Sequence, residues 1–164
     1  MAQPRQPAHP NQGWYDRPEG VPEAITAGGV IARKGKDGSI WLAAAVEQDH
    51  ESLVLPKGHV EDGEDLAETA RREVREEAGF SHLILLGELG HRERLNYART
   101  EWKKTYYFLF LTHEIDVVPT ENWLHDPPRW FSLDEKPALF WPEQNDLLEE
   151  TRARIRKLVQ AASA

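Results

Sequence analysis

The 164-residue sequence contains no cysteine. This absence excludes disulfide bonds, thiolate zinc sites, iron–sulfur clusters and a cysteine nucleophile, and it fits a reducing compartment. The sequence also lacks an apolar run of the roughly 18 residues that a transmembrane helix needs, and its first twenty residues lack the apolar core of a secretory signal. We therefore expect a soluble, cytoplasmic protein that has no membrane partner.

Basic residues are few, since 20 Lys and Arg stand against 28 Asp and Glu, for a formal net charge of -8. Non-specific binding to nucleic-acid backbones needs clustered positive charge, so duplex nucleic acid is not an expected partner. A chain of this length is expected to form one domain with its own core. No feature of the sequence indicates an oligomeric state.

The first 22 residues have little apolar content and several prolines. Such a composition cannot bury enough apolar area to offset the entropy of ordering. We therefore predict a flexible N-terminal arm over residues 1–22 and a single domain over residues 23–164. Whether Trp14 and Tyr15 dock on that domain stays open. The prolines of the arm are Pro4, Pro7, Pro10, Pro18 and Pro22.

Hydrophobic periodicity predicts a mixed α/β protein of the α+β type. Strands are expected at residues 25–32, 40–46, 83–89 and 105–111, with short ones at 53–55 and 130–131. Helices are expected at residues 65–78, closed by Gly79, and at 143–161, with a brief helix capped by Ser132 between them. Such an order of elements favours a mixed sheet with helices packed on its faces.

The segment with the strongest chemical signal is residues 58–80, GHVEDGEDLAETARREVREEAGF. Helical spacing places Leu66, Ala70, Val74 and Ala78 on one apolar arc, together with Ala67. Glu77 lies about 20° from Leu66 on the same helical wheel, inside that arc. A free carboxylate buried there is costly unless another charge compensates it.

Glu73, Glu76 and Glu77 follow one another at spacings that let three carboxylates converge on one end of a pocket. The ordinary interpretation is a solvated acidic face paired with neighbouring arginines. However, like charges one turn apart repel each other, and one of them points toward the core. A divalent cation relieves both problems, because hard oxygen ligands suit magnesium or manganese. Arg72 can hold one carboxylate in position.

The spacing of Gly58, Glu64, Arg72-Glu73, Glu76-Glu77 and Gly79 matches every fixed position of the Nudix box, and the sequence resembles a Nudix hydrolase over about residues 24–159. The resemblance implies a mixed sheet sandwiched between helices, with a catalytic loop–helix–loop. It also implies cleavage of a phosphoanhydride bond by water activated by Mg²⁺, or by Mn²⁺. Metal contacts would come from Glu73, Glu76, Glu77 and Gly58, supported by Glu64 and Arg72.

Two further runs are similar to those of diadenosine tetraphosphate hydrolases: LPKGHVE at residues 55–61, and RLNY at 94–97 followed by KKT at 103–105. A long polyphosphate needs several cations beyond the metal, and a purine needs a flat partner. The resemblance implies a small-molecule dinucleoside polyphosphate as substrate. Tyr97 would stack on a base, and Tyr107 is a second candidate, although an alternating strand more often uses such a ring for packing. The implied phosphate contacts are Lys57, His59, Arg94, Lys103 and Lys104.

The sequence departs from that group before its last strand, where the group has a Ser-His-Glu-His-like run and this chain has TENWLHDPPRW at residues 120–130. Glu121 and His125 are therefore candidates for a catalytic role in this loop. The general base stays open among Glu76, Glu77 and these two residues.

Other functions stay open as well. Residues 105–110 and 130–135 also resemble diphosphoinositol polyphosphate phosphohydrolases, and hydrolysis of an oxidised nucleoside triphosphate is a further alternative. A non-catalytic nucleotide sensor would retain the fold but lose box carboxylates, and none is lost here. A further alternative is an interaction module that a partner recruits through the N-terminal arm.

Overall fold

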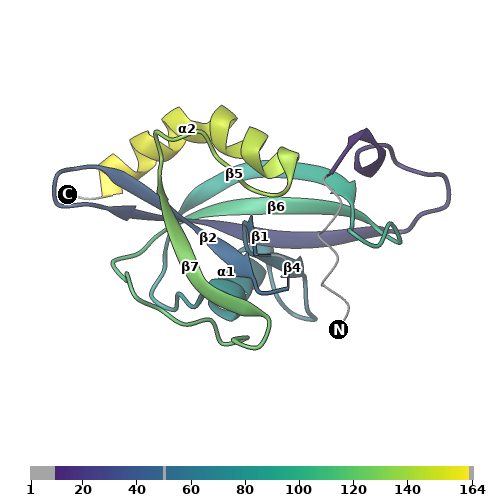
Figure 1. The fold of residues 1–164 in the computed structure, drawn as a ribbon, viewed down its shortest axis with the longest axis horizontal. Coiled ribbons are helices and arrows are strands. Elements are labelled where there is room, and N and C mark those ends of the chain that lie inside the picture. Colours follow the sequence, from purple (N-terminus) through teal and green to yellow (C-terminus); the bar gives the residue numbers. More distant parts are fainter. Residues whose placement is uncertain (1–9, 50, 163–164) are drawn as a thin grey trace.

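The computed structural model describes residues 10–49 and 51–162. It contains a seven-stranded mixed sheet with one long helix on each face (Figure 1), which confirms the predicted fold class. The strands are β1 (Glu23–Lys34), β2 (Ile40–Glu47), β3 (Ser52–Val54), β4 (Lys57–His59), β5 (Ile84–Leu95), β6 (Trp102–Leu111) and β7 (His125–Ser132). The helices are η1 (Gln12–Trp14), a single 3-10 turn, α1 (Leu66–Ala78) and α2 (Pro142–Ala162).

Strand β1 organises the sheet. One edge of β1 pairs in parallel with β6 along residues 23–32. Its other edge is shared, since residues 26–28 pair with β4 and residues 31–34 pair with β2, both antiparallel. Two strands on one edge force the sheet to open between β4 and β2. The chain that follows β3 crosses this opening on its way to α1.

A glycine pair in β1 allows close packing at the opening. A Cβ on Gly28 would lie 2.4 Å from the carbonyl oxygen of Pro56, and a Cβ on Gly29 would lie 2.5 Å from a methyl carbon of Val74. The Gly29 amide donates to that same Pro56 carbonyl at 3.0 Å. Because the absence of side chains lets β1 approach both segments, α1 and the loop before β4 lie against the centre of the sheet.

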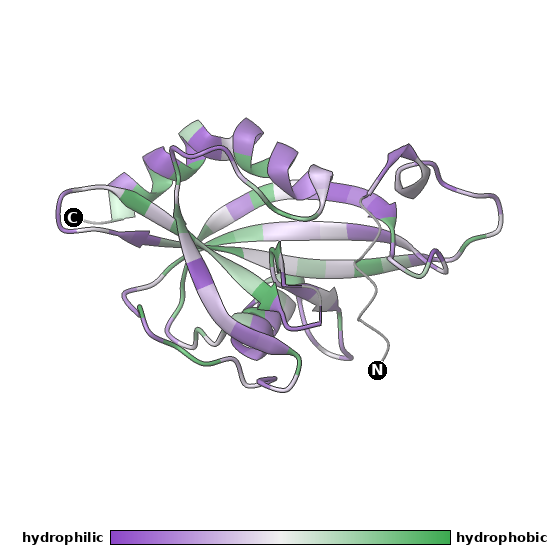
Figure 2. Ribbon diagram, in the orientation of Figure 1, coloured by the Kyte–Doolittle hydropathy of each residue, from purple (hydrophilic) through white to green (hydrophobic). Residues whose placement is uncertain are grey.

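Each face of the sheet has its own core. Hydrophobic and hydrophilic residues alternate along α2, as the hydropathy colouring shows (Figure 2). The apolar residues Leu147, Leu148, Ile155 and Val159 are buried on the face of the sheet that α2 covers. On this face Leu109 packs with Leu147 and Ile155, while on the other face Val74 packs with Phe110. A fully buried side chain of this kind contributes about 1.5–3 kcal/mol. The two cores fix α1 and α2 on opposite faces.

Helix α1 begins and ends on local signals. The Asp65 side chain accepts from the Glu68 amide at 2.8 Å, and the Glu68 carboxylate accepts from the Asp65 amide at 3.4 Å, which is a capping box. Gly79 ends the helix at φ +91°, a left-handed conformation that favours glycine. Asp65, which was predicted as the first helical residue, is the N-cap, and the rest of the predicted helix is confirmed.

The terminal helix predicted at residues 143–161 is confirmed as α2, and the short strand predicted at 130–131 is longer, since β7 covers residues 125–132. The brief helix at Ser132 was wrong: residues 133–134 form a turn, in which the Ser132 hydroxyl accepts from the Asp134 amide at 3.2 Å. None of the described helices is both long and apolar enough to cross a membrane.

The described part of the predicted arm packs on the domain. Trp14 at the end of η1 is only 5% exposed and belongs to the core on the α1 face. The backbone carbonyl of Pro22 accepts from the Trp102 amide at 2.8 Å. Packing therefore begins before the predicted boundary at residue 22, and residues 1–9 of the predicted arm lie outside the described residues.

Candidate active site

Glu73 is buried where α1 meets β4. A Cβ on Gly58 would lie 2.1 Å from its Oε1 atom, so only glycine permits this approach. Burial raises the pKa of Glu73, and the negative charges of Glu76 and Glu121 raise it further, while Arg72 opposes them. Glu73 is thus an acid held close to other acids in a poorly solvated place.

Glu77 lies one turn further along α1 and faces inward, as the helical wheel predicted. Its carboxylate accepts from the backbone amide of Lys57 at 3.1 Å. Burial raises the pKa of Glu77 well above its ordinary value, and the charges of Glu73 and Glu47 contribute to the same shift. Glu47, at the end of β2, was missed from the sequence, because nothing local shows that β2 ends beside α1.

Glu121 reaches this group from the loop before β7. Its backbone amide donates to the Glu76 carbonyl at 2.9 Å, and the neighbouring Thr120 amide donates to the Arg75 carbonyl at 3.3 Å. The bond to Glu76 uses a carbonyl group that the end of a helix leaves unpaired, and the Arg75 carbonyl also accepts from the Gly79 amide at 3.1 Å. The predicted loop carboxylate therefore lies beside the helical ones. His125, the other loop candidate, is buried at the start of β7 opposite Glu47 in the strand pairing.

Arg72 lies among the carboxylates. Its Nη1 atom donates to Glu73 Oε1 at 2.8 Å and to Glu76 Oε2 at 3.1 Å, and its Nε atom donates to Glu64 Oε2 at 2.8 Å. The Arg72 hydrogen bond lowers the pKa of Glu64 to about 2, helped by the backbone amide of Glu61. Glu64 and Arg72 thus lie in one hydrogen-bond network with the acidic group, and the supporting role that the resemblance implies for them stays a prediction.

The donor set suits a divalent cation, because buried carboxylates with raised pKa values are stabilised by positive charge and offer hard oxygen atoms. Within residues 10–49 and 51–162, no three acidic or histidine side chains stand in ligand geometry for one ion. Arg72 instead bridges Glu73 and Glu76.

Positive charge gathers beside the acids. Desolvation lowers the pKa of Lys57 to about 7, with contributions from the positive charges of Arg94 and Lys103. Desolvation also lowers the pKa of Lys103, which interacts with Glu77 and Glu73 as well. The structure therefore brings Lys57 and Lys103 next to the carboxylates.

Three of the predicted phosphate contacts lie elsewhere or are already engaged. Arg94 is 4% exposed, forms an ion pair with Glu143 and lies 3.4 Å from the ring centroid of Trp141. It is a buried structural cation rather than a free one. Lys104 alternates with Lys103 along β6 and so points to the opposite face, where it lies over Tyr106. His59 is half-exposed and pairs with Glu101 at 3.4 Å.

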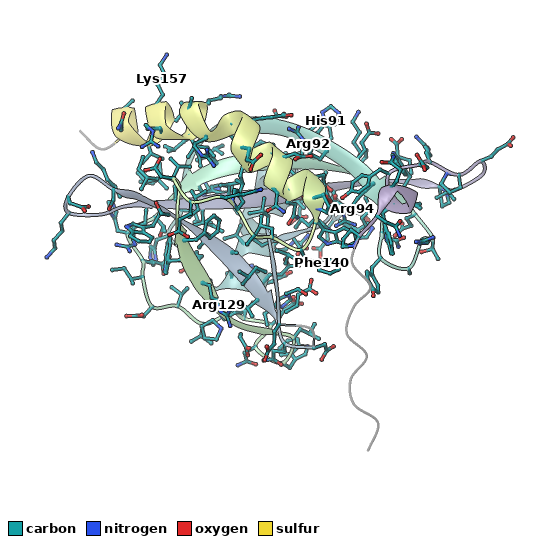
Figure 3. The ribbon with its side chains drawn as sticks, turned by 45° about the horizontal axis from the view of Figure 1, so that its top comes forward. His91, Arg92, Arg94, Arg129, Phe140 and Lys157 are labelled. Atoms are coloured by element: carbon teal, nitrogen blue, oxygen red, sulfur yellow. The ribbon has the colours of Figure 1, made fainter. Side chains whose placement is uncertain are left out.

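The two tyrosines predicted to stack on a base differ in exposure. Tyr107 is 1% exposed and its hydroxyl accepts from Gln144 Nε2 at 3.0 Å, so the prediction that it stacks on a base was wrong: the ring belongs to the core. Tyr97 is 48% exposed. Its ring lies 6.4 Å from Phe140 and 6.3 Å from Trp141. Figure 3 shows Phe140 and Arg94 near the start of α2, at the same end of the molecule.

Comparison with known proteins agrees with this geometry. Residues 7–151 match the NUDIX domain, and the chain belongs to the Nudix family. It is 42% identical over 81 residues to the bis(5′-nucleosyl)-tetraphosphatase (asymmetrical) of Rattus norvegicus, covering 49% of this chain and 55% of that protein. It is 29% identical over 144 residues to the RNA pyrophosphohydrolase of Caulobacter vibrioides, covering 77% and 83%. The chain therefore spans about half the length of the tetraphosphatase relatives that it matches.

Solved structures give the same result for the fold. The Ap4A hydrolase of C. elegans in a binary complex aligns with a TM-score of 0.66 and 27% identity, over 82% of this chain and 98% of that one. A Nudix protein from Listeria monocytogenes aligns with a TM-score of 0.68 and 19% identity, over 82% and 96%. The second similarity concerns the fold alone.

Proposed function

We propose that this protein hydrolyses phosphoanhydride bonds in dinucleoside polyphosphates such as diadenosine tetraphosphate. The observation that carries the proposal is the change of charge across the site: the acids of α1 lie directly beside Lys57 and Lys103, and an aromatic group with Tyr97 lies beyond them. A substrate with several phosphates and a purine matches this order, since it needs metal ligands, cations and a flat partner in turn.

In this proposal Glu73, Glu76 and Glu77 hold Mg²⁺, with Mn²⁺ as a substitute. The bound cation would neutralise phosphate charge and lower the pKa of a water molecule. Arg72 and Glu64 keep the carboxylates in place, and Gly58 leaves room for Glu73. These six residues are the part of the site that the Nudix box defines.

We assign the role of general base to Glu121. It comes from a loop rather than from α1, and its backbone is fixed to the last turn of α1 at Glu76. Glu73 and Glu76 are paired with Arg72, and Glu77 accepts from Lys57. Glu121 thus lies close enough to the acids to influence the pKa of Glu73 while making none of these pairs. A general base accepts the proton of the attacking water and contributes about 10²–10⁴-fold.

Lys57 and Lys103 are the residues that we expect to bind the phosphate chain, and Tyr97 the one that stacks on a base. Stacking on an aromatic ring tolerates different bases. We therefore expect this site to favour substrates that carry a base, with little discrimination between one base and another. Two lysines in addition to the metal favour substrates whose phosphate chain extends beyond a two-phosphate bridge, and we expect dinucleoside polyphosphates with four or more phosphates to be preferred.

A second candidate substrate is the 5′ end of an RNA, because the RNA pyrophosphohydrolase relative covers more of the chain than the tetraphosphatases do. The charge of -8 argues against it, since an RNA chain beyond its first nucleotides would meet an acidic surface.

A substrate panel tests the proposal. Purified protein with magnesium would be given diadenosine tetra-, penta- and hexaphosphate, ADP-ribose, an oxidised dGTP, a diphosphoinositol phosphate and an RNA with a 5′ triphosphate. We expect the highest kcat/KM on the dinucleoside polyphosphates. Equal or faster turnover of ADP-ribose would contradict the proposal, because a two-phosphate bridge has no use for the additional cations.

A further inference from the structure

The N-terminal segment around η1 completes the aromatic group of the site. Asn11 Oδ1 accepts from the Gly13 amide at 2.9 Å and so caps η1, which ends in Trp14. The Trp14 ring stacks on Tyr97 with centroids 6.2 Å apart at 29°, and meets the edge of Trp141 at 6.3 Å and 66°. In Figure 1 this dark purple segment lies beyond the ends of β5 and β6, next to their connection.

The same segment also reaches the buried ion pair near the cations. The Tyr15 hydroxyl donates to Glu143 Oε2 at 3.0 Å, and Glu143 pairs with Arg94. Arg94 in turn influences the pKa values of both Lys57 and Lys103. Of two consecutive residues of the segment, Trp14 therefore contacts Tyr97, and Tyr15 contacts the buried ion pair whose arginine influences the two lysines.

Packing alone does not explain why residue 14 is a tryptophan. Its Nε1 atom is buried and has no hydrogen-bond partner in the described part of the chain. A buried donor without a partner costs stability, and phenylalanine would avoid that cost. What the indole provides is a wide face, against which Tyr97 stacks on one side while Arg99 lies 4.0 Å from the ring centroid.

Tyr97 needs such support because it lies in the turn that connects β5 to β6. Asn96 holds this turn through its side chain, which accepts from the Thr100 amide at 2.7 Å, and Arg99 adopts a φ of +60° within it. A side chain that is 48% exposed in a turn has rotamer freedom to lose when a ligand binds. Stacking on a buried ring restricts that freedom in advance.

We propose that Trp14 is a positioning residue for Tyr97, so that the segment of residues 11–15 supports, from behind Tyr97, the site for the purine of the substrate. The purine as ligand rests on the proposed function. Trp14 itself is covered by the domain and acts through Tyr97, so its loss should weaken binding of a base and leave binding of phosphate groups unchanged.

Equilibrium binding separates these two effects. Titration calorimetry with magnesium would compare ADP with inorganic pyrophosphate in the full chain and in Trp14→Ala, Trp14→Phe and Arg17→Ala. Arg17 is a control in the same segment, since its partners among the described residues are the surface residue Glu23 at 3.0 Å and the ring of Trp102, whose centroid lies 5.9 Å away, rather than Tyr97 or the lysines. We expect Trp14→Ala to weaken ADP binding about fivefold or more, given the usual strength of base stacking. Trp14→Phe, whose ring is narrower than an indole, should restore only part of the affinity, and Arg17→Ala should change nothing.

If Trp14→Ala lowers stability, a double-mutant cycle with Tyr97→Ala separates an effect on Tyr97 from a general loss of folding. In the Tyr97→Ala background the additional loss from Trp14→Ala should disappear, since coupled residues are not additive. Unchanged ADP affinity in Trp14→Ala, or equal losses for ADP and pyrophosphate, would overturn the inference. If the wild type binds ADP but hydrolyses nothing in the substrate panel, the proposed function fails while this binding test still decides the role of Trp14.

Discussion

The Glu73 carboxylate fills the space that a side chain at Gly58 would need: a Cβ on Gly58 would lie 2.1 Å from Glu73 Oε1. The two residues come from different elements, β4 and α1, which are brought together by the opening of the sheet beside β1. The backbone of β4 therefore touches the carboxylate that the family uses for metal. This contact links the glycine of the Nudix box to its first helical glutamate.

Gly58→Ala should accordingly impair activity more than folding. The added methyl group must displace the Glu73 carboxylate, and a misplacement of about 1 Å in an active site can cost about 10²-fold in rate. The measurement is kcat/KM on diadenosine tetraphosphate together with the thermal unfolding curve. Gly35→Ala is the control, because its methyl group would meet only the turn between β1 and β2, at Ser39 and Asp37. Wild-type kcat/KM in Gly58→Ala would show that the contact has no role in positioning.

Magnesium should stabilise the folded protein. A ligand at 100 times its Kd adds about 2.7 kcal/mol to the free energy of unfolding when it binds only the folded state. We expect Tm to rise when magnesium replaces EDTA, and the rise to be lost in Glu77→Gln, whose neutral side chain is a weak ligand. The control is Glu88→Gln on β5. A rise of the same size in Glu77→Gln would exclude this residue as a ligand.

Loss of charge should lower stability at Arg94 and weaken substrate binding at Lys103. Arg94→Met leaves Glu143 buried without its charged partner, with only the Tyr15 hydroxyl still donating to it. Loss of one member of a buried ion pair typically costs about 3–5 kcal/mol of stability, and the double variant with Glu143→Leu should recover much of that loss. Lys103→Met should leave stability within about 0.5 kcal/mol and raise KM for the polyphosphate. Urea unfolding and steady-state kinetics measure the two effects. A stable Arg94→Met protein would contradict the buried ion pair.

Glu114 should make stability depend on pH. Burial raises its pKa, but hydrogen bonds from the His82 and Ser81 amides, at 2.7 and 2.9 Å, outweigh burial and hold the pKa below its ordinary value. A depressed pKa in the folded state gives stability that is present at neutral pH and is lost as the pH falls through that pKa. Glu114→Gln should therefore cost about 1 kcal/mol at pH 7 and less at pH 3. An equal cost at both pH values would contradict this assignment.

Local signals in the sequence predicted the parts of the site that are local in structure. Asp65, Glu68 and Gly79 determine where α1 begins and ends, and helical spacing alone showed that Glu77 faces inward. The carboxylates that we propose as metal ligands, and the residues that support them, thus follow from a single segment of chain. Their closeness to Glu121 was expected only through the resemblance to the family.

Contacts between distant segments were not predictable in the same way. We predicted Arg94 to be a phosphate contact. The structure pairs it instead with Glu143, which is 49 positions away in the sequence. We predicted Tyr107 as a candidate for stacking on a base. Its hydroxyl instead accepts a hydrogen bond in the core from Gln144, which is 37 positions away in the sequence. Trp14 stood in a proline-rich stretch with no apolar pattern around it, so its burial depends on a surface that exists only after β5, β6 and α2 assemble.

The most direct test of the site is turnover of diadenosine tetraphosphate with magnesium by the wild type, Glu76→Gln and Glu77→Gln, with Glu88→Gln as the control for a lost acid outside the site. We predict that both helical variants remain folded and lose about 10²-fold or more in kcat/KM, in the range seen when one stabilising group of an active site is removed, while the control keeps wild-type activity. Near wild-type turnover by both Glu76→Gln and Glu77→Gln would contradict the assignment of these carboxylates to metal-dependent hydrolysis.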